Sequence, residues 1–234
     1  LGFGFGPVFQ KAGAGNYLEF LAPGVIAMSI LFTAVFAGME IIWDKQFGFL
    51  KETLVAPVSR FQIMVGRTLG GATVSLLQGI IVFLLSLLIG YRLPALSAIL
   101  PALVFMILIA LLFTAFGTAI ASTLSDMQGF QLIMNFIVMP TFFLSGALFP
   151  LQGLPKALAR VVAFNPLAYG VDGLRTYLSG ITYYSPSLDF LILSGVTAFA
   201  GEERDKRKQQ SANALARLTH FLSARKAASK AFWQ

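Results

Sequence analysis

Charged and polar side chains are concentrated in one short segment, WDKQFGFLKETLVAPVSR, which runs from Trp43 to Arg60 between two long apolar stretches. Its apolar residues follow the spacing of one helical face, and Pro57 predicts the end of that helix. These apolar residues are Trp43, Phe47, Leu50 and Leu54, and the charged ones between them are Asp44, Lys45, Lys51 and Glu52. Such a helix lies flat on a membrane and presents its charged face to water. The pattern predicts ionic docking of a protein from outside the membrane, or an ordinary loop helix with no partner.

Covalent and nucleotide chemistry is not predicted for this chain. The sequence has no GxxxxGK[ST], HExxH or GxSxG motif and no cysteine, and its one histidine, His220, lies in the C-terminal tail. Acidic or basic residues are absent from the middle of the clear apolar spans, and Glu19 and Glu40 lie at span ends. Since buried charges usually mark ion or proton routes, the pattern disfavours a proton-coupled carrier or a charged channel filter. A transporter of this kind needs an energy source on another chain.

The composition is that of an integral membrane protein. The 234 residues are 57% hydrophobic and 12% charged, with a mean hydropathy of +0.79, whereas soluble domains carry about twice that charge. The formal charge of +7 is uneven, because residues 201–234 hold eight Lys/Arg against three acids and the remainder holds nine against seven. The body of the protein is therefore not a basic surface for nucleic acid, and we expect no nucleic-acid partner.

The expected fold is all-α, a polytopic membrane helix bundle. Four apolar stretches are long enough to cross about 30 Å of hydrocarbon, and a fifth run, Leu188–Ala200, is too short. The four are Phe20–Ile42, Leu69–Tyr91, Leu96–Ser122 and Phe130–Phe149. Lys and Arg are denser in the Trp43–Thr68 loop than in the long segment after Phe149, which places that loop in the cytoplasm. Small-residue pairs at Gly66/Gly70 and Gly117/Ala121 permit close helix packing.

The stretch from Pro150 to Ser187 contains two short helical patterns. An apolar face over Leu154–Val162 predicts the first, and Asn165-Pro166 predicts the start of the second, which Gly180 ends. We expect two amphipathic helices on the outer surface, which either cover a transport pathway or shield the ends of the spans from water.

Several segments together resemble the membrane subunits of type-2 ATP-binding cassette (ABC) exporters, similar to the daunorubicin, multidrug and nodulation-factor permeases. They are YLEFLAPGV (Tyr17–Val25), WDKQFGFLKETLVAPVSRFQIMVGRTLGG from Trp43, MPTFFLSGALFPLQGLP (Met139–Pro155) and NPLAYGVDGLR (Asn165–Arg175). The resemblance covers about residues 15–180. It implies six spans, a dimer of permeases that is homomeric or heteromeric, and two cytosolic ABC ATPase subunits. ATP and Mg are then bound by the ATPase, and this chain binds no cofactor or metal.

The resemblance also places a cytoplasmic coupling helix at Asp44–Ala56. The residues expected to couple to the ATPase are Asp44, Lys45, Phe49, Lys51, Glu52 and Arg60, and the substrate pathway is not specified. The family's first span would precede Leu1. We expect residues 1–200 to form the permease domain and the basic residues 201–234 to be a non-native tail, from a shifted reading frame or an artificial junction near Ala200.

The leading functional hypothesis is the permease subunit of an ATP-driven exporter in the plasma membrane, embedded in the lipid bilayer and carrying a lipophilic or amphipathic, drug-like substrate. Export of a lipid-linked polysaccharide by the same architecture is the first alternative. A membrane scaffold that recruits a cytosolic protein without transport is the second.

Overall fold

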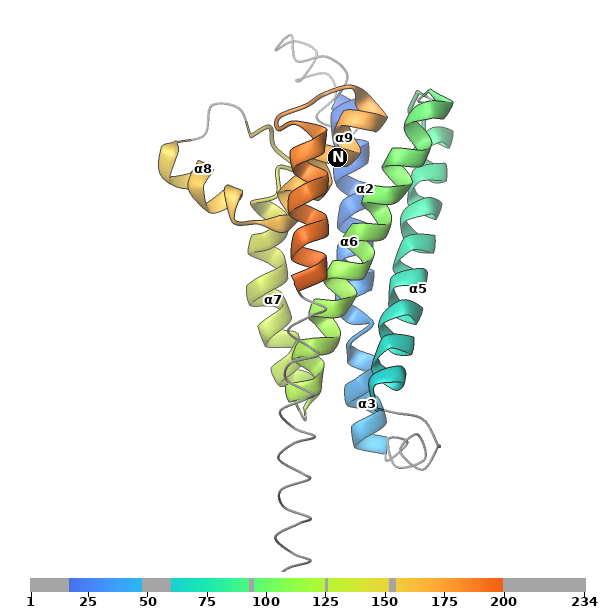
Figure 1. Cartoon of the computed structure of the whole chain (residues 1–234), viewed down its shortest axis with the longest axis vertical. Helices are drawn as coiled ribbons and strands as arrows, with labels where there is room; N and C mark the ends of the chain where they lie inside the picture. Colours follow the sequence, from blue (N-terminus) through green and yellow to red (C-terminus); the bar gives the residue numbers. More distant parts are fainter. Residues whose placement is uncertain (1–16, 48–59, 93–94, 125, 152–154, 200–234) are drawn as a thin grey trace, which may run out of the picture. The chain divides into compact units, whose positions relative to one another are not determined.

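The computed structural model describes residues 17–47, 60–92, 95–124, 126–151 and 155–199. Its contacts divide the chain into two units, Leu1–Thr197 and Ala198–Gln234. The described part of the first unit is a bundle of helices, which confirms the expected all-α membrane fold (Figure 1). Three of its helical stretches are long and apolar enough to cross a membrane, Leu18–Phe47, Gln62–Leu88 and Leu96–Thr123.

The first span is interrupted. Helix α2 (Tyr17–Phe36) ends at a two-residue turn, and α3 (Met39–Phe47) continues after it. The sequence pattern predicted one uninterrupted span, because the apolar run continues across Gly38 without a polar residue at the break. Helix α5 (Arg60–Leu88) begins well before the predicted Leu69. Most described residues of the predicted Trp43–Thr68 loop are therefore helical.

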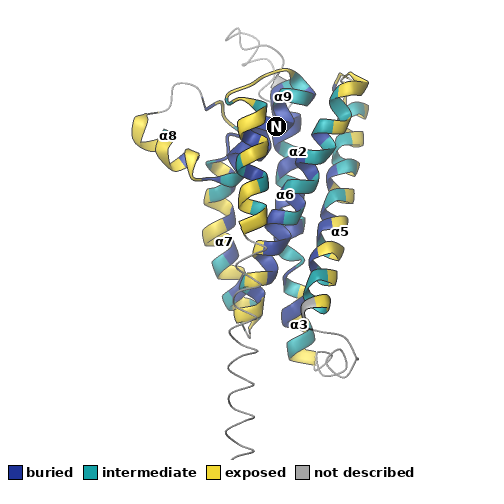
Figure 2. Cartoon of the chain, in the orientation of Figure 1, coloured by how far each residue is buried: buried dark blue, intermediate teal, exposed yellow. Residues whose placement is uncertain are grey.

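Helix α2 is the centre of the bundle. It packs against α5, α6 (Leu96–Thr123) and α9 (Pro166–Ser179), and Ile26, Ile30 and Leu31 are fully buried. Figure 2 shows α2 and the inner face of α6 as the most buried ribbons, whereas α5 and α7 expose a long outer face. Exposed apolar side chains on that outer face of α5 are what a lipid-facing helix requires.

Helix α7 (Met127–Phe143) is shorter than the predicted span. Asp126 caps its start, where the Asp126 carboxylate accepts a hydrogen bond from the Gly129 N–H at 2.6 Å. The predicted end at Phe149 was wrong. Residues 144–150 form turns, in which Gly146 has a positive φ of 75° and the Ser145 hydroxyl donates to the Phe142 carbonyl.

The two helices predicted after Pro150 exist as α8 (Lys156–Ala163) and α9. The predicted start of α9 is confirmed, since the Asn165 side chain accepts from the Leu167 N–H at 3.0 Å, and so is its end, since Gly180 is left-handed at φ 71°. The predicted position of α9, on the outer surface, was wrong. Helix α9 is buried on nearly every side, including Asp172 and Arg175, and is part of the core. A further apolar helix, Pro186–Phe199, replaces the predicted Leu188–Ala200 run.

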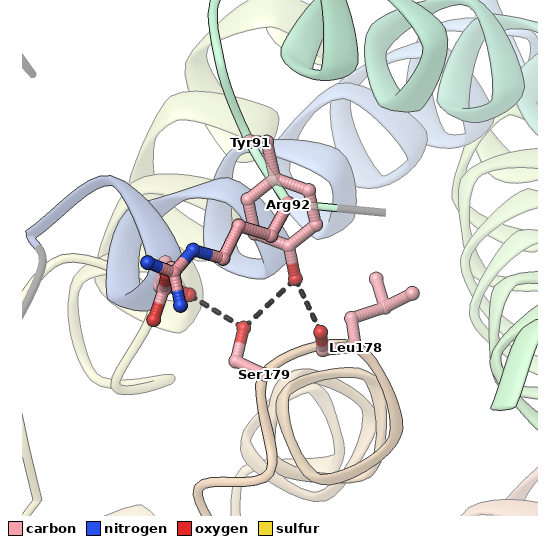
Figure 3. Close-up of polar contacts among 5 residues, drawn as sticks. Tyr91, Arg92, Leu178 and Ser179 are labelled. Carbon is pink, nitrogen blue, oxygen red and sulfur yellow. Dashed lines mark hydrogen bonds and ion pairs between the residues drawn. The ribbon is translucent and has the colours of Figure 1, made fainter. Parts of the chain in front are cut away.

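At the end of the bundle opposite α3, hydrogen bonds join α9 to α2 and to Tyr91, which follows α5 (Figure 1). The Tyr91 hydroxyl donates to the Leu178 carbonyl at 2.5 Å, and the Ser179 hydroxyl donates to the Glu19 carbonyl at 2.5 Å (Figure 3). Glu19 also forms an ion pair with Arg92 at 3.6 Å. These bonds connect α2, α9 and the segment that follows α5. Three parts of the chain therefore hold this end of the bundle together.

Candidate functional site

Helix α3 carries the part of the predicted coupling segment that the structure describes. Asp44 and Lys45 lie in its last turns, and Arg60 is the first residue of α5. The predicted residues Phe49, Lys51 and Glu52 lie outside the described residues, as does the side chain of Arg60. Trp43 and Phe47 are exposed apolar side chains of α3, at 46% and 70%.

Lys45 holds α3 against the end of α6. Its ammonium group donates to the backbone carbonyls of Ala121 at 3.0 Å, Ser122 at 2.8 Å and Leu124 at 2.9 Å. The last carbonyls of a helix have no partner within the helix and carry its negative dipole end, so a cation that bonds three of them stabilises the terminus. Lys45 therefore bonds α3 to the C-terminal end of α6.

Asp44 connects the same turn of α3 to α5. Its carboxylate forms an ion pair with the Arg67 guanidinium, and both side chains are about one quarter exposed, at 21% and 27%. The pair borders a cleft of about 490 Å³, which Glu40, Trp43 and Gly66 also line. Adjacent residues of α3 are thus bound to different helices, Asp44 to α5 and Lys45 to α6.

Glycines bring the break between α2 and α3 against α6. A Cβ added to Gly38 would lie 2.5 Å from the Gly117 carbonyl oxygen, and one added to Gly117 would meet the Val35 carbonyl oxygen. A Cβ added to Gly71 of α5 would likewise meet the side chains of Ala37 and Thr114. The backbones of α6 and of the α2–α3 region therefore approach closely at glycines, and α5 packs against small side chains there. Of the predicted Gly117/Ala121 pair, Gly117 packs closely against Val35 and Ala121 is buried, whereas Gly66 and Gly70 have no described atom within 4 Å of an added Cβ.

The arrangement joins α3 to two neighbouring helices by charged contacts. Among the described residues no group of three His, Cys, Asp or Glu side chains lies together in a way that could hold a metal ion. Asp44 and Lys45 were predicted to couple to an ATPase, which stays a prediction. Their partners within the chain, Arg67 and the α6 carbonyls, were not predicted from the sequence. Backbone carbonyls leave no sequence signal, and only the fold brings them next to α3.

The comparisons with known proteins agree with this geometry. A family model described as ABC-2 type transporter matches residues 1–179. The chain is 29% identical over 192 residues to the ycf38 transport permease of Cyanophora paradoxa, covering 79% of this chain and 66% of the relative. It is 29% identical over 182 residues to nodulation protein J of Rhizobium leguminosarum bv. viciae, covering 77% of this chain and 70% of the relative.

A third relative is the multidrug ABC transporter permease YbhR of Escherichia coli (strain K12), with 25% identity over 158 residues, 67% of this chain and 43% of the relative. The chain thus spans between 43% and 70% of the length of these three relatives. The family model extends over more than half of the chain and reaches the last residue of α9. The chain belongs to the ABC-2 type transporter family, as a membrane permease.

Proposed function

We propose that this chain is the permease subunit of an exporter in the plasma membrane, driven by a separate cytosolic ATPase that docks on the segment after α3. Two permease copies and two ATPase subunits form the working assembly, and the α3 end of the bundle faces the cytoplasm. One observation carries the proposal. Adjacent residues of α3, Asp44 and Lys45, fasten it to α5 and α6, so that a partner moving α3 also moves two spans.

The proposed substrate is lipophilic or amphipathic. An open groove of about 590 Å³ lies between α6, α9 and the Pro186–Phe199 helix, and its size is that of a site for a drug-sized molecule. Its lining is mostly apolar and aromatic, and includes Val104, Phe105, Tyr177 and Phe190. Vesicle assays with a lipophilic dye and with a lipid-linked polysaccharide separate the two substrate classes, since the first is transported under this proposal and the second is not.

The test of coupling exchanges the charges of the Asp44–Arg67 pair. Asp44→Arg and Arg67→Asp each place like charges together, while the double variant restores an opposite pair. In vesicles that contain the co-purifying ATPase, each single variant should lower substrate-stimulated ATP hydrolysis about 2- to 5-fold, which is the range expected from a partly exposed pair worth under about 1 kcal/mol. The double variant should recover most of the stimulation.

The control is Arg92→Glu, which places like charges at the Glu19–Arg92 pair on the opposite end of the bundle. It should leave the stimulation unchanged. Normal stimulation in both single variants of the Asp44–Arg67 pair would refute transmission through α3. An ATPase that binds but is never stimulated would support the scaffold function instead.

A further inference from the structure

A buried carboxyl group without a partner lies at the start of the Pro186–Phe199 helix. Asp189 is fully buried, and among the described residues no hydrogen-bond donor reaches either of its carboxylate oxygens. An ionised carboxylate in such a place would cost several kcal/mol. Its surroundings must therefore supply either a positive charge or a proton.

The neighbouring ionisable group is a second carboxyl, that of Asp172 in α9. Asp172 is 2% exposed and accepts hydrogen bonds from the Tyr183 N–H at 3.0 Å and the Tyr184 N–H at 2.6 Å. Tyr183 and Tyr184 lie just before the Pro186–Phe199 helix, so these bonds bring the start of that helix, with the Asp189 carboxyl, next to the Asp172 carboxyl. Two ionised carboxylates can only accept hydrogen bonds, so a bond between them requires one proton.

The charges around the pair determine which carboxyl is ionised. Arg175 lies one helical turn after Asp172 in α9, donates to the Gly146 carbonyl at 2.9 Å and lies 4.0 Å from the centroid of the Phe20 ring. Burial lowers the pKa of its guanidinium to about 10, which still leaves it charged at neutral pH. Burial raises the pKa of the Asp172 carboxyl, while the backbone N–H groups of Tyr184 and Tyr183, and then Arg175, oppose that rise. Tyr169 and Tyr184 are ionisable neighbours of Asp189, and the Tyr169 hydroxyl donates to the Ala163 carbonyl at 2.8 Å. Helix α6, which also packs against α9, has no ionisable residue.

One cation and two carboxyl groups thus share a buried site, and a single proton makes it neutral. Asp172 accepts the backbone hydrogen bonds of Tyr183 and Tyr184 and is stabilised by the charge of Arg175, so it is the ionised carboxyl of the pair. We propose that Asp189 and Asp172 form a proton-binding site, in which the Asp189 carboxyl holds the proton and donates it to the Asp172 carboxylate. The bond joins the Pro186–Phe199 helix to α9.

Loss of the proton would place two carboxylates in contact, and the single positive charge of Arg175 would not offset both. The expected response is separation of the Pro186–Phe199 helix from α9, next to the groove that both elements line. The site is therefore a proton-sensitive contact between these elements. This inference does not depend on which substrate the permease carries or on its ATPase.

Infrared spectroscopy tests the proton directly, on the full chain in lipid nanodiscs with isotope-labelled aspartate. At neutral pH the wild type should show the C=O stretch of a buried carboxylic acid that exchanges slowly in D₂O, and Asp189→Asn should lack it. Asp126→Asn is the matched control, because Asp126 is exposed and asparagine also caps a helix, so its band should persist. A wild-type spectrum without a protonated buried carboxyl, or a band that persists in Asp189→Asn, would overturn the proposal.

Thermal unfolding against pH gives an independent readout. A carboxyl that is protonated when folded and ionised when unfolded stabilises the fold at low pH, and this stabilisation is lost as pH rises through its folded pKa. Between about pH 5 and about pH 8 the wild-type Tm should therefore fall by several degrees, and Asp189→Asn, whose amide can still donate to Asp172, should flatten that dependence. An unchanged slope in Asp189→Asn would contradict the proposal. A Tm that rises with sodium at fixed pH, in the wild type alone, would identify a cation site and also overturn it.

Discussion

At the scale of single residues, the described charged side chains of the predicted coupling segment, Asp44 and Lys45, bond to other helices of the same chain. Lys45 was predicted to face a partner protein, and its ammonium group bonds three carbonyls of this chain instead of lying free in water. That does not test its role towards the ATPase. It means that a partner pulling on the segment after α3 acts on a helix already fixed to α6.

Replacing Lys45 tests how much this contact contributes. Lys45→Met keeps an unbranched apolar side chain but leaves three terminal carbonyls of α6 without their cation, so the free energy of unfolding should fall by about 1–2 kcal/mol. Lys45→Arg keeps the charge and should lose less. Thermal unfolding in detergent measures both, and a Lys45→Met chain as stable as the wild type would show that water replaces the ammonium group without cost.

At the scale of elements, the sequence predicted where α9 begins and ends better than it predicted what surrounds that helix. Asn165-Pro166 and Gly180 bound α9 because capping is local chemistry. The same helix was predicted to lie on the surface because it carries Tyr, Asp, Arg and Gly among its apolar residues. In a membrane protein this mixed composition belongs to the core, since lipid is as apolar as leucine and small or polar residues are what neighbouring helices contact.

The end of α7 was missed for a related reason. Residues after Phe143 are as apolar as the helix before them, so periodicity continued to predict a span. The turn depends on Gly146 at φ 75° and on the Arg175 guanidinium, which donates to the Gly146 carbonyl at 2.9 Å. The second contact comes from a residue distant in the sequence, and an apolar run contains no sign of it.

The glycine contact between α6 and the α2–α3 break gives a prediction about helix packing. Alanine normally stabilises a helix by up to about 1 kcal/mol relative to glycine. Gly117→Ala should nevertheless destabilise the protein and impair coupling, because its methyl group would meet the backbone of Val35. Gly70→Ala is the matched control, since an added Cβ there has no described neighbour within 4 Å, and it should be neutral or stabilising. Equal stability of the two variants, measured by unfolding, would refute close backbone packing at this point.

At the scale of the whole molecule, the described bundle has two differently built ends. One end is held by backbone and side-chain bonds among α2, α9 and Tyr91, and the other by the charged contacts of α3 (Figures 1 and 3). Composition and hydropathy were sufficient to predict the membrane bundle. They could not pair Lys45 with carbonyls 76 to 79 positions away, or Asp44 with Arg67, because such contacts follow from the packing of spans rather than from any local pattern.

Site-specific photo-crosslinking tests most directly whether the ATPase docks at the α3 end. Phe47 and Phe164 are phenylalanines of high exposure, at 70% and 89%, on helices at opposite ends of the bundle. Each is replaced by a photoreactive phenylalanine in the full chain, in its native membrane, and the adducts are identified by mass spectrometry. We predict an adduct with a P-loop ATPase from position 47 and none from position 164. An ATPase adduct from position 164 alone, or from neither position while the ATPase still co-purifies with the chain, would contradict coupling through α3.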